Sequence, residues 1–281
     1  MAISLASLQT STRKPPRILI YGGEGTGKTT FAICEHAPQS PDSLPGKARD
    51  GVVVIQTEDG LGDIQCQAFP IAKTYEDVEE AMGALYAEQH SFDTLVIDSI
   101  DWLEPLVWDY ICRTNGWDSI EKPGYGKGYA EADYIWRRFF SGINALRDDK
   151  GMTIILIAHQ QIITIEEPDL PAYQSAEIKL HKRAAAITKE YVDVIVQAKL
   201  KTFVTSDSTA KATGKKGEEV KRQLATTTGQ RVIVTQPKPG ATAKNRYHLP
   251  AELPLDWSAF AAAMQTTLNR NTYPTKEENL S

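Results

Sequence analysis

The stretch Gly22-Gly23-Glu24-Gly25-Thr26-Gly27-Lys28-Thr29, which follows the apolar run RILIY (17–21), decides the fold. It fits the pattern G-x-x-x-x-G-K-[ST] in full, which is typical of a loop that binds phosphate groups. Glycines let backbone N–H groups turn toward phosphate oxygens, and a helix that starts at the loop points its positive end at the same anion. The apolar run before the loop predicts a buried strand, and TTFAICEHA (29–37) predicts a helix after it.

A nucleotide is therefore the ligand that we expect at this turn, bound with Mg²⁺. Lys28 should reach the β- and γ-phosphates, and the Thr29 hydroxyl should be a ligand of the Mg²⁺ ion. The residues predicted to bind the nucleotide are Gly22, Gly23, Glu24, Gly25, Thr26, Gly27, Lys28, Thr29 and Thr30.

Strand-like and helix-like segments alternate over the first 160 residues, which predicts an α/β fold with a mostly parallel sheet covered on both faces. Later β-like runs follow one another closely and predict an antiparallel C-terminal extension of the same sheet. The predicted strands after the first are 51–59, 94–100, 152–160, 191–200, 201–205 and 231–237. A helix should begin at Thr74, because Asp77 stands three residues later, as in a capping box.

This pattern predicts one domain rather than two. We expect a core over 17–270, with loop insertions near 38–50 and 206–229. Residues 1–16 are interpreted as a flexible N-terminal arm, and 271–281 as a disordered tail.

Bulk composition limits the possible partners. The formal net charge of −5 supplies no overall positive field for nucleic acid or membrane, so any DNA contact must come from local basic segments. The three cysteines are far apart and fit neither a disulfide framework nor usual zinc spacing. Because the sequence has no apolar run of about 18 residues, we expect no membrane partner, and we see no signal peptide, so a cytoplasmic location is expected.

Two acidic residues stand at predicted strand ends. Asp98 ends the run LVID and should hold Mg²⁺ through water. Glu58 follows the second strand, and it can orient or deprotonate the attacking water if that strand lies next to the phosphate-loop strand. Asp59 should point away, and an exposed acidic turn is the alternative interpretation.

The fourth strand should end in His159 and Gln160. A side-chain amide there can hydrogen-bond the γ-phosphate and respond to its loss, so Gln160 is predicted to sense the phosphate. His159 is the alternative sensor.

The order of these features resembles the RecA-like recombinase and motor family. The resemblance covers about 17–250 and implies a RecA-like ATPase in which Glu58 is the catalytic base and Gln160 couples the ATP state to a DNA-binding loop. KNRY (244–247) is similar to the Lys-Asn-Arg-Phe-Gly motif of RadA-type proteins, although Tyr247 and His248 depart from it. That similarity implies that Lys244 and Arg246 reach the nucleotide of a neighbouring subunit, in a filament or a ring.

The whole chain also looks like the compact RecA-core ATPases of bacteriophages, which are associated with single-strand annealing and recombination. This resemblance implies a slow, DNA-modulated ATPase, with single-stranded DNA and a single-strand-binding protein as partners. Two segments, 115–130 and 161–186, correspond to the family's DNA loops. Their candidate DNA-binding residues are Lys122, Tyr125, Lys127, Tyr129, Lys179, Lys182 and Arg183. For a third basic patch within 211–222 we favour a solvated loop.

Two other classes of function stay open. A translocating motor or helicase needs strongly DNA-stimulated hydrolysis and usually an additional domain, and no such domain is visible in this sequence. A regulatory ATPase without a DNA partner is supported by the acidic net charge. The sequence leaves open DNA against RNA, and whether ATP hydrolysis or only ATP binding is required.

Overall fold

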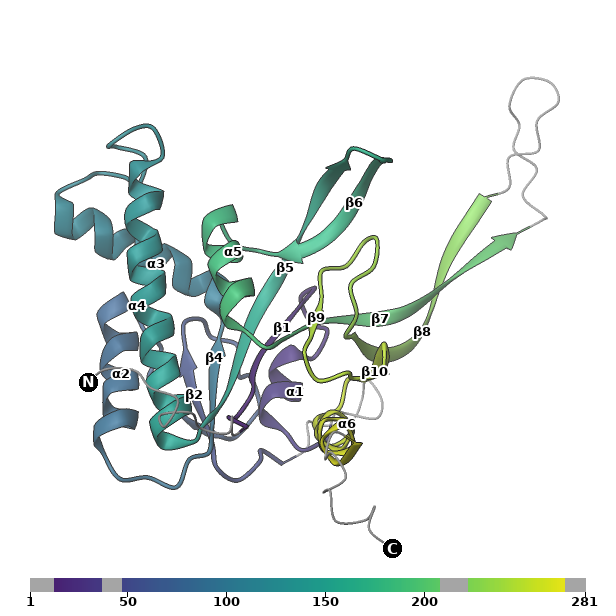
Figure 1. The fold of residues 1–281 in the computed structure, drawn as a ribbon, viewed down its shortest axis with the longest axis horizontal. Coiled ribbons are helices and arrows are strands. Elements are labelled where there is room, and N and C mark those ends of the chain that lie inside the picture. Colours follow the sequence, from purple (N-terminus) through teal and green to yellow (C-terminus); the bar gives the residue numbers. More distant parts are fainter. Residues whose placement is uncertain (1–12, 37–46, 208–221, 271–281) are drawn as a thin grey trace, which may run out of the picture.

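The computed structural model of the protein describes residues 13–36, 47–207 and 222–270. The described strands form a sheet with the order β10-β8-β7-β1-β5-β4-β2-β3, to which β6 is added beside β5 and β9 beside β7 (Figure 1). The strands are β1 (Arg17–Gly22), β2 (Val52–Gln56), β3 (Gln67–Ala68), β4 (Thr94–Asp98), β5 (Thr153–Glu167), β6 (Leu170–Ile178), β7 (Val194–Asp207), β8 (Arg222–Val234), β9 (Lys244–Asn245) and β10 (Glu252–Pro254). The helices are α1 (Lys28–Ile33), α2 (Tyr75–Ala87), α3 (Ile100–Asn115), α4 (Lys127–Lys150), α5 (Lys182–Tyr191) and α6 (Trp257–Arg270).

The centre of the sheet is parallel and its C-terminal side is antiparallel, as the sequence predicted. β7, β1, β5, β4, β2 and β3 each run parallel to their neighbours in this series. β8 runs antiparallel to β7, and β10 runs antiparallel to β8. Gly22 is in register with His159, and Gln56 with Asp98, so the carboxyl ends of these strands lie at one edge of the sheet.

Alternate residues of each central strand face opposite sides of the sheet, and each side has its own buried core. Leu19 and Tyr21 of β1 belong to the core that includes α2, α3, α4 and α5. Ile18 and Ile20 belong to the other core, where Phe31 of α1 and Phe260 of α6 pack edge to face, 5.5 Å apart. The molecule is thus a sheet between two helical layers, with α1 and α6 forming one of them.

The predicted start of the helix at Thr74 is confirmed. The Thr74 side chain accepts a hydrogen bond from the Asp77 backbone N–H, and the Asp77 carboxylate accepts one from the Thr74 backbone N–H, which completes the capping box. Val78, Met82 and Leu85 are buried at helical spacing behind this cap.

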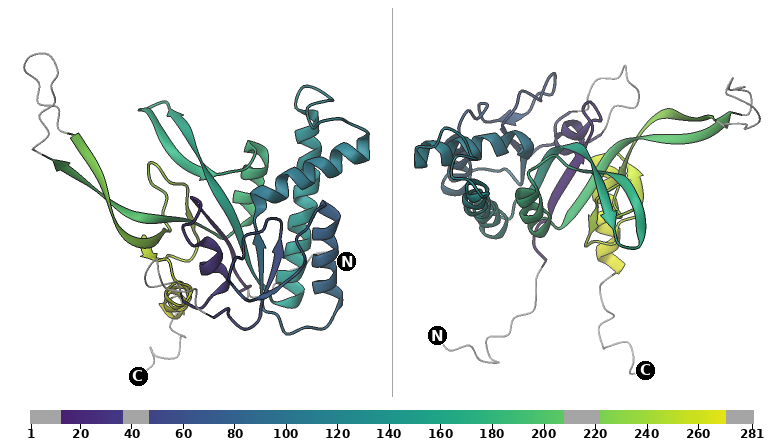
Figure 2. Two further views of the ribbon diagram at one scale, coloured as in Figure 1. Left: turned by 180° about the vertical axis from the view of Figure 1, so that it is seen from behind. Right: turned by 90° about the horizontal axis from the view of Figure 1, so that it is seen from above.

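Two antiparallel hairpins project from the edge of the sheet at which the parallel strands end (Figures 1 and 2). β5 pairs with β1 only as far as His159 and continues from Gln160 as a hairpin with β6. The second predicted DNA loop, 161–186, is therefore wrong as a loop, because it consists of this hairpin and the start of α5. β-branched residues in QIITIEE (161–167) suit an extended strand, and this preference extends β5 beyond its predicted end.

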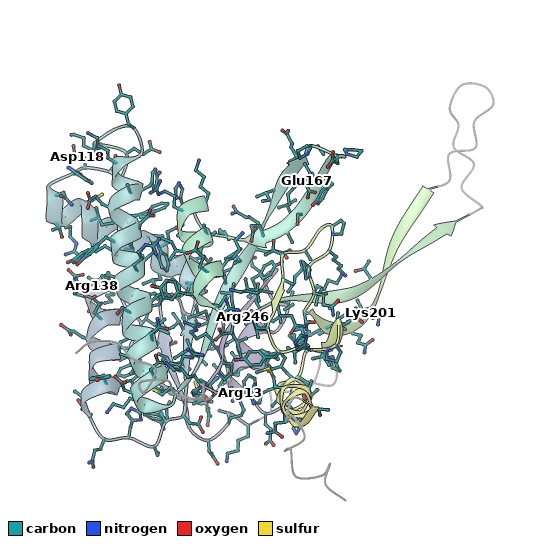
Figure 3. The ribbon with its side chains drawn as sticks, viewed as in Figure 1. Arg13, Asp118, Arg138, Glu167, Lys201 and Arg246 are labelled. Carbon is teal, nitrogen blue, oxygen red and sulfur yellow. The ribbon has the colours of Figure 1, made fainter. Side chains whose placement is uncertain are left out.

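The other hairpin is also longer than predicted. Two predicted strands, 191–200 and 201–205, form the single strand β7, and β8 begins at Arg222 inside the stretch expected to be a loop. The expected basic patch within 211–222 lies almost entirely outside the described residues, as do most of the N-terminal arm and all of 271–281. Figure 3 marks Lys201 where this hairpin leaves the sheet and Glu167 at the tip of the β5–β6 hairpin. No helix among the described residues is long and apolar enough to cross a lipid bilayer.

Candidate nucleotide-binding site

The glycine-rich loop connects β1 to α1, where the sequence predicted it. Gly25 (φ 67°) and Gly27 (φ 96°) have left-handed backbone conformations that favour glycine. A β-carbon at Gly22 would stand 2.3 Å from the Ala198 carbonyl oxygen of β7, so this strand end also requires glycine. The Thr26 hydroxyl donates a 2.8 Å hydrogen bond to the Gly23 carbonyl and closes the turn.

Lys28 lies over this loop and is 6% exposed. Its ammonium donates hydrogen bonds to the carbonyl oxygens of Gly22 (3.2 Å) and Gly23 (2.9 Å). Burial lowers the pKa of Lys28, although the nearby carboxylates of Asp98, Asp101 and Glu58 act to raise it. The ammonium forms no ion pair within the described part of the chain, so an incoming anion would find a largely dehydrated cation fixed over the loop.

Thr29 and Asp98 are brought together although β5 lies between β1 and β4. The Thr29 hydroxyl donates a 2.8 Å hydrogen bond to the Asp98 carboxylate, which is 3% exposed. Burial raises the pKa of Asp98 to about 6, against the opposing effect of this hydrogen bond. A hydroxyl and a carboxylate are oxygen donors of the kind that Mg²⁺ prefers, and Mg²⁺ usually takes its other ligands from phosphates and water. The residues present therefore fit the predicted ion.

Glu58 lies at the same edge of the sheet, although the strand before it is not a neighbour of β1. β2 is not next to β1, because β5 and β4 separate them. The ends of β2 and β4 are joined instead by Thr57, whose hydroxyl donates to the Ser99 carbonyl (2.6 Å) and accepts from the Ser99 N–H (2.8 Å). The Ser99 hydroxyl then donates a 2.5 Å hydrogen bond to the Glu58 carboxylate, which holds that carboxylate toward the site.

His159 completes this cluster through Asp101, a residue for which no role was predicted from the sequence. Asp101, in the first turn of α3, accepts hydrogen bonds from the backbone N–H of His159 and from its Nδ1, each at 2.9 Å. The hydrogen bond that His159 donates to Asp101 raises the pKa of His159, and His159 Nδ1 also lies 3.9 Å from the Glu58 carboxylate. The only sequence signal for Asp101 was its place three residues after Asp98.

Gln160 is the residue of β5 that lies against the phosphate loop. Its amide nitrogen is 3.6 Å from the position that a β-carbon at Gly23 would occupy. Its oxygen accepts a long hydrogen bond, 3.4 Å, from Gln197 of β7. Both candidate sensors therefore lie at this edge of the sheet, His159 beside Glu58 and Gln160 beside Gly23.

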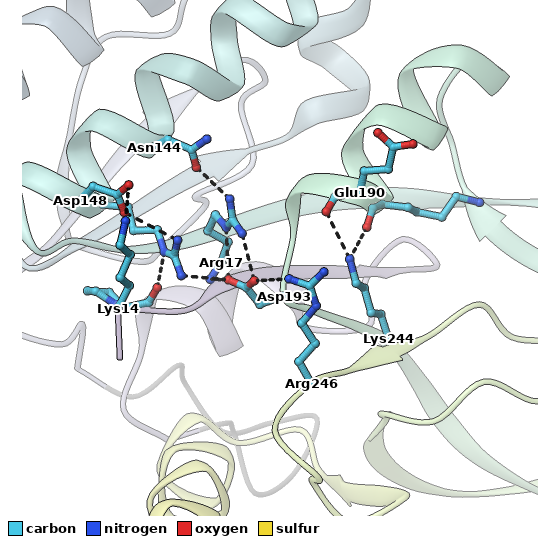
Figure 4. A network of polar contacts seen from close by, with 11 residues as sticks. Lys14, Arg17, Asn144, Asp148, Glu190, Asp193, Lys244 and Arg246 are labelled. Carbon is cyan, nitrogen blue, oxygen red and sulfur yellow. Dashed lines mark hydrogen bonds and ion pairs between the residues drawn. The ribbon is translucent and has the colours of Figure 1, made fainter. Parts of the chain in front are cut away.

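Lys244 and Arg246 lie at the opposite edge, where the parallel strands begin (Figure 4). The Lys244 ammonium donates to the carbonyl oxygens of Lys189 (2.6 Å) and Glu190 (3.3 Å). Arg246 donates a 3.0 Å hydrogen bond to Asp193. β1 separates this edge from the phosphate loop by six residues, about 20 Å of extended chain, so neither cation reaches the loop of its own chain.

Asp193 also pairs with two other arginines at this second edge. Arg17 donates to it from both its backbone N–H and its guanidinium, at 3.0–3.1 Å, and Arg147 lies 3.5 Å away. The side chains of Arg17 and Arg147 are 14% and 13% exposed, whereas that of Arg246 is 55% exposed. Arg246 is therefore the member of this cluster that is open to a second molecule.

The two predicted DNA segments meet where α4 and α5 begin. The ring of Tyr129 stacks on His181, with ring centroids 4.1 Å apart, and so joins the first turn of α4 to the start of α5. Tyr125, at the tip of that connection, is fully exposed.

The predicted cations of these segments fall into two groups. Lys122 pairs with Asp118, and Arg183 makes a bidentate ion pair with Asp133. Three others are exposed and have no ion pair within the described part of the chain: Lys127, Lys179 and Lys182.

Comparisons with known proteins identify the family of this chain. Residues 14–247 match the model of a protein family described as an AAA domain. The crystal structure of the RadB recombinase matches with 12% sequence identity and a TM-score of 0.42, over 88% of this chain and 90% of that chain. No curated protein matches the chain. Because the family model covers most of the sequence, the chain belongs to the AAA domain family, and it has the RecA-like P-loop ATPase fold that its phosphate loop and parallel sheet indicate.

Proposed function

We propose that the protein is an oligomeric, ATP-dependent single-stranded-DNA-binding protein of phage-type recombination or strand annealing. One observation carries the enzymatic part. Lys28, the Thr29–Asp98 pair and Glu58, from three separate parts of the chain, converge at one edge of the sheet. These groups are the ones that ATP hydrolysis needs: a cation for the phosphates, oxygen ligands for a metal ion and a carboxylate for water.

Each residue has a defined part in this proposal. Lys28 binds the β- and γ-phosphates over the loop, and Thr29 and Asp98 hold Mg²⁺, which would stabilise negative charge on the phosphates. Glu58, fixed by Ser99, orients and deprotonates the attacking water. Gln160, beside Gly23, senses the γ-phosphate, and its place at the root of the β5–β6 hairpin connects that event to a projecting element.

The positions of Lys244 and Arg246 support a nucleotide site that is shared between two subunits. Lys244 and Arg246 cannot reach the phosphate loop of their own chain, and Arg246 is half-exposed. In an assembly these cations would neutralise developing charge at a neighbour's nucleotide, as an arginine finger does. To do so, Arg246 must leave Asp193, and Lys244 must leave the two carbonyl oxygens at the end of α5.

Charge and exposure support DNA contact at the junction of α4 and α5. Lys127, Lys179 and Lys182 can pair with phosphates, and Tyr125 can stack on a base. Tyr129 is already stacked on His181, so its predicted part changes from base stacking to holding the two segments together. Because Lys122 and Arg183 are paired within the chain, we assign them a smaller contribution.

The first test measures fluorescence anisotropy of a labelled single-stranded oligonucleotide with the wild-type chain, with and without ATP and Mg²⁺, at two salt concentrations. We expect salt-sensitive binding that requires ATP. A Lys127→Ala/Lys182→Ala variant should bind more weakly, and Lys73→Ala, which removes an exposed lysine outside the two predicted DNA segments, should bind like wild type. No binding in any nucleotide state would remove DNA from the proposal and favour a regulatory ATPase, whereas stepwise ATP-driven movement on DNA would favour a motor.

The second test asks whether Arg246 acts in trans. Arg246→Ala should bind ATP but lose turnover, and Glu58→Ala should do the same. A mixture of the two variants should regain part of the activity, because some interfaces then combine an intact Glu58 with an intact Arg246. If co-assembled, folded variants show no rescue, the trans assignment is wrong.

A further inference from the structure

Arg231 of β8 lies against the phosphate loop, although it is far from the loop in sequence. A β-carbon at Gly27 would stand 3.3 Å from Nη1 and 3.7 Å from Cδ of Arg231. The same β-carbon would be 3.2 Å from Leu255. Gly27 therefore combines a left-handed backbone with the lack of a side chain, and this combination lets the guanidinium approach the residue that precedes Lys28.

The sheet, rather than a loop, sets the position of Arg231. β8 pairs with β7, where Arg231 is in register with Leu200, and β7 pairs with β1, where Ala198 is in register with Gly22. The carbonyl of Arg231 also accepts a 3.1 Å hydrogen bond from the Leu255 N–H. These ladders place the side chain beside the end of β1 whatever the state of the loop.

The guanidinium of Arg231 differs in its surroundings from those of Arg17 and Arg147. Within the described part of the chain, its guanidinium makes no hydrogen bond or ion pair, whereas Arg17 and Arg147 are bound to Asp193. A guanidinium carries five N–H donors and stays charged at all physiological pH values. Placed beside Gly27, which precedes Lys28 in the loop, it adds positive charge that an incoming anion would neutralise.

We propose that Arg231 is a second cation of the nucleotide site and binds the polyphosphate of a nucleoside di- or triphosphate held by the same chain. The inference rests on the proposed function in one respect, that the loop binds a nucleotide. It adds a direct path from the ligand to β8, and so to the root of the β7–β8 hairpin. Occupation of the site would restrain a strand that continues into a projecting element (Figure 1).

The test compares wild type with Arg231→Gln, Arg231→Lys and the matched control Arg137→Gln, which removes an exposed arginine of α4. Affinity for MgADP and MgATP is measured by calorimetry, and thermal unfolding is followed with and without nucleotide. Loss of a charge-assisted contact should weaken binding of both nucleotides by about tenfold to a hundredfold in Arg231→Gln, and by less in Arg231→Lys. The control should bind like wild type.

Thermal unfolding separates this part from a structural one. Without nucleotide, Arg231→Gln should unfold at the wild-type temperature, and only the stabilisation by nucleotide should shrink. If Arg231→Gln is itself less stable, Arg231→Met, which keeps the packing of the side-chain stem, replaces it under the same criterion. Wild-type affinity in the folded neutral variant would overturn this inference alone, whereas a wild-type chain that binds neither nucleotide would overturn the proposed function.

Discussion

The two edges of the parallel strands carry the same kinds of charged side chain but surround them differently. At the carboxyl edge, where the parallel strands end, the Asp98 carboxylate accepts a hydrogen bond from a hydroxyl and has no arginine partner among the described residues, and burial raises its pKa to about 6. At the amino edge, burial alone would raise the pKa of Asp193, but the hydrogen bonds and charges of Arg17 and Arg147 outweigh it and hold the pKa below its ordinary value. In the proposed function the first edge keeps Lys28 and Asp98 for ligands, whereas the second edge satisfies most of its charges within the chain.

This difference predicts that substitutions at the carboxyl edge change binding or turnover, and that substitution of the buried Asp193 at the amino edge changes stability. Arg246 is the exception at the amino edge, because its proposed part lies at the nucleotide of a neighbouring subunit. The largest effect should follow Glu58→Gln, because it removes the proposed base while keeping the shape of the side chain. We expect turnover to fall by about a hundredfold to ten-thousandfold with ATP binding retained, measured by phosphate release and calorimetry. Asp59→Asn, one residue along and exposed, is the control. Equal losses of turnover in both variants would show that Glu58 is not the catalytic base.

Asp193→Asn tests the amino edge. Removing the charge leaves three arginines around a neutral group, and we expect a loss of about 3 kcal/mol in the free energy of unfolding, measured with urea. ATP affinity of the folded variant should not change. Asp118→Asn, which breaks an exposed pair with Lys122, should cost less than about 1 kcal/mol. A loss of ATP affinity in folded Asp193→Asn would break the comparison between the edges.

Lys28→Ala tests the carboxyl edge in the opposite sense. ATP affinity should fall by about a hundredfold, because a charged hydrogen-bond donor to phosphate is lost. The free energy of unfolding without nucleotide should stay the same or rise, since the substitution removes a buried ammonium that has no ion pair in the described structure. Normal ATP affinity would contradict the interpretation of the loop.

The smallest effect concerns Glu104 of α3, a buried carboxylate whose oxygens accept hydrogen bonds from the His181 N–H. Burial raises its pKa from 4.5 to about 7, so the folded chain keeps a proton that the unfolded chain loses. Glu104 should therefore destabilise the fold increasingly as pH rises from about 4.5 to about 7, by roughly 2 kcal/mol between pH 5 and 8.

Urea unfolding at several pH values checks this prediction. Glu104→Gln should remove most of this pH dependence, and Glu80→Gln, which changes an exposed residue of α2, should leave it unchanged. If wild type and Glu104→Gln lose stability equally between pH 5 and 8, the buried carboxylate is not its source.

Much of the carboxyl edge was predictable from sequence, because it depends on local patterns. The loop from Gly22 to Thr29 and the run that ends at Asp98 each carry their signal within a few residues. The role of Glu58 was predicted on the condition that β2 lies next to β1, and the strand order does not meet this condition, since a crossover of strand order has no local signature. Asp101 and Arg231 were not predicted, because only the packing of α3 and β8 places them beside the loop and the strand ends.

The hairpins show how strand length escapes prediction. β5 and β7 each continue beyond the core, where alternation of apolar and polar residues no longer reports on a buried face. Likewise, the motif similarity of 244–247 implied that Lys244 and Arg246 act together, but their internal partners, Asp193 and the end of α5, come from distant parts of the chain.

β7 runs the whole distance between the two edges. Its first residues pair with β9 beside Arg246, its middle borders Gly22, and its last residues belong to the projecting hairpin. A hydrogen-bonded strand resists stretching, so a shift imposed at one end of β7 would displace the whole strand. In a proposed assembly, a neighbour that pulls on Arg246 would thus move the wall of the next phosphate loop, and ATP state could pass from subunit to subunit as a mechanical signal.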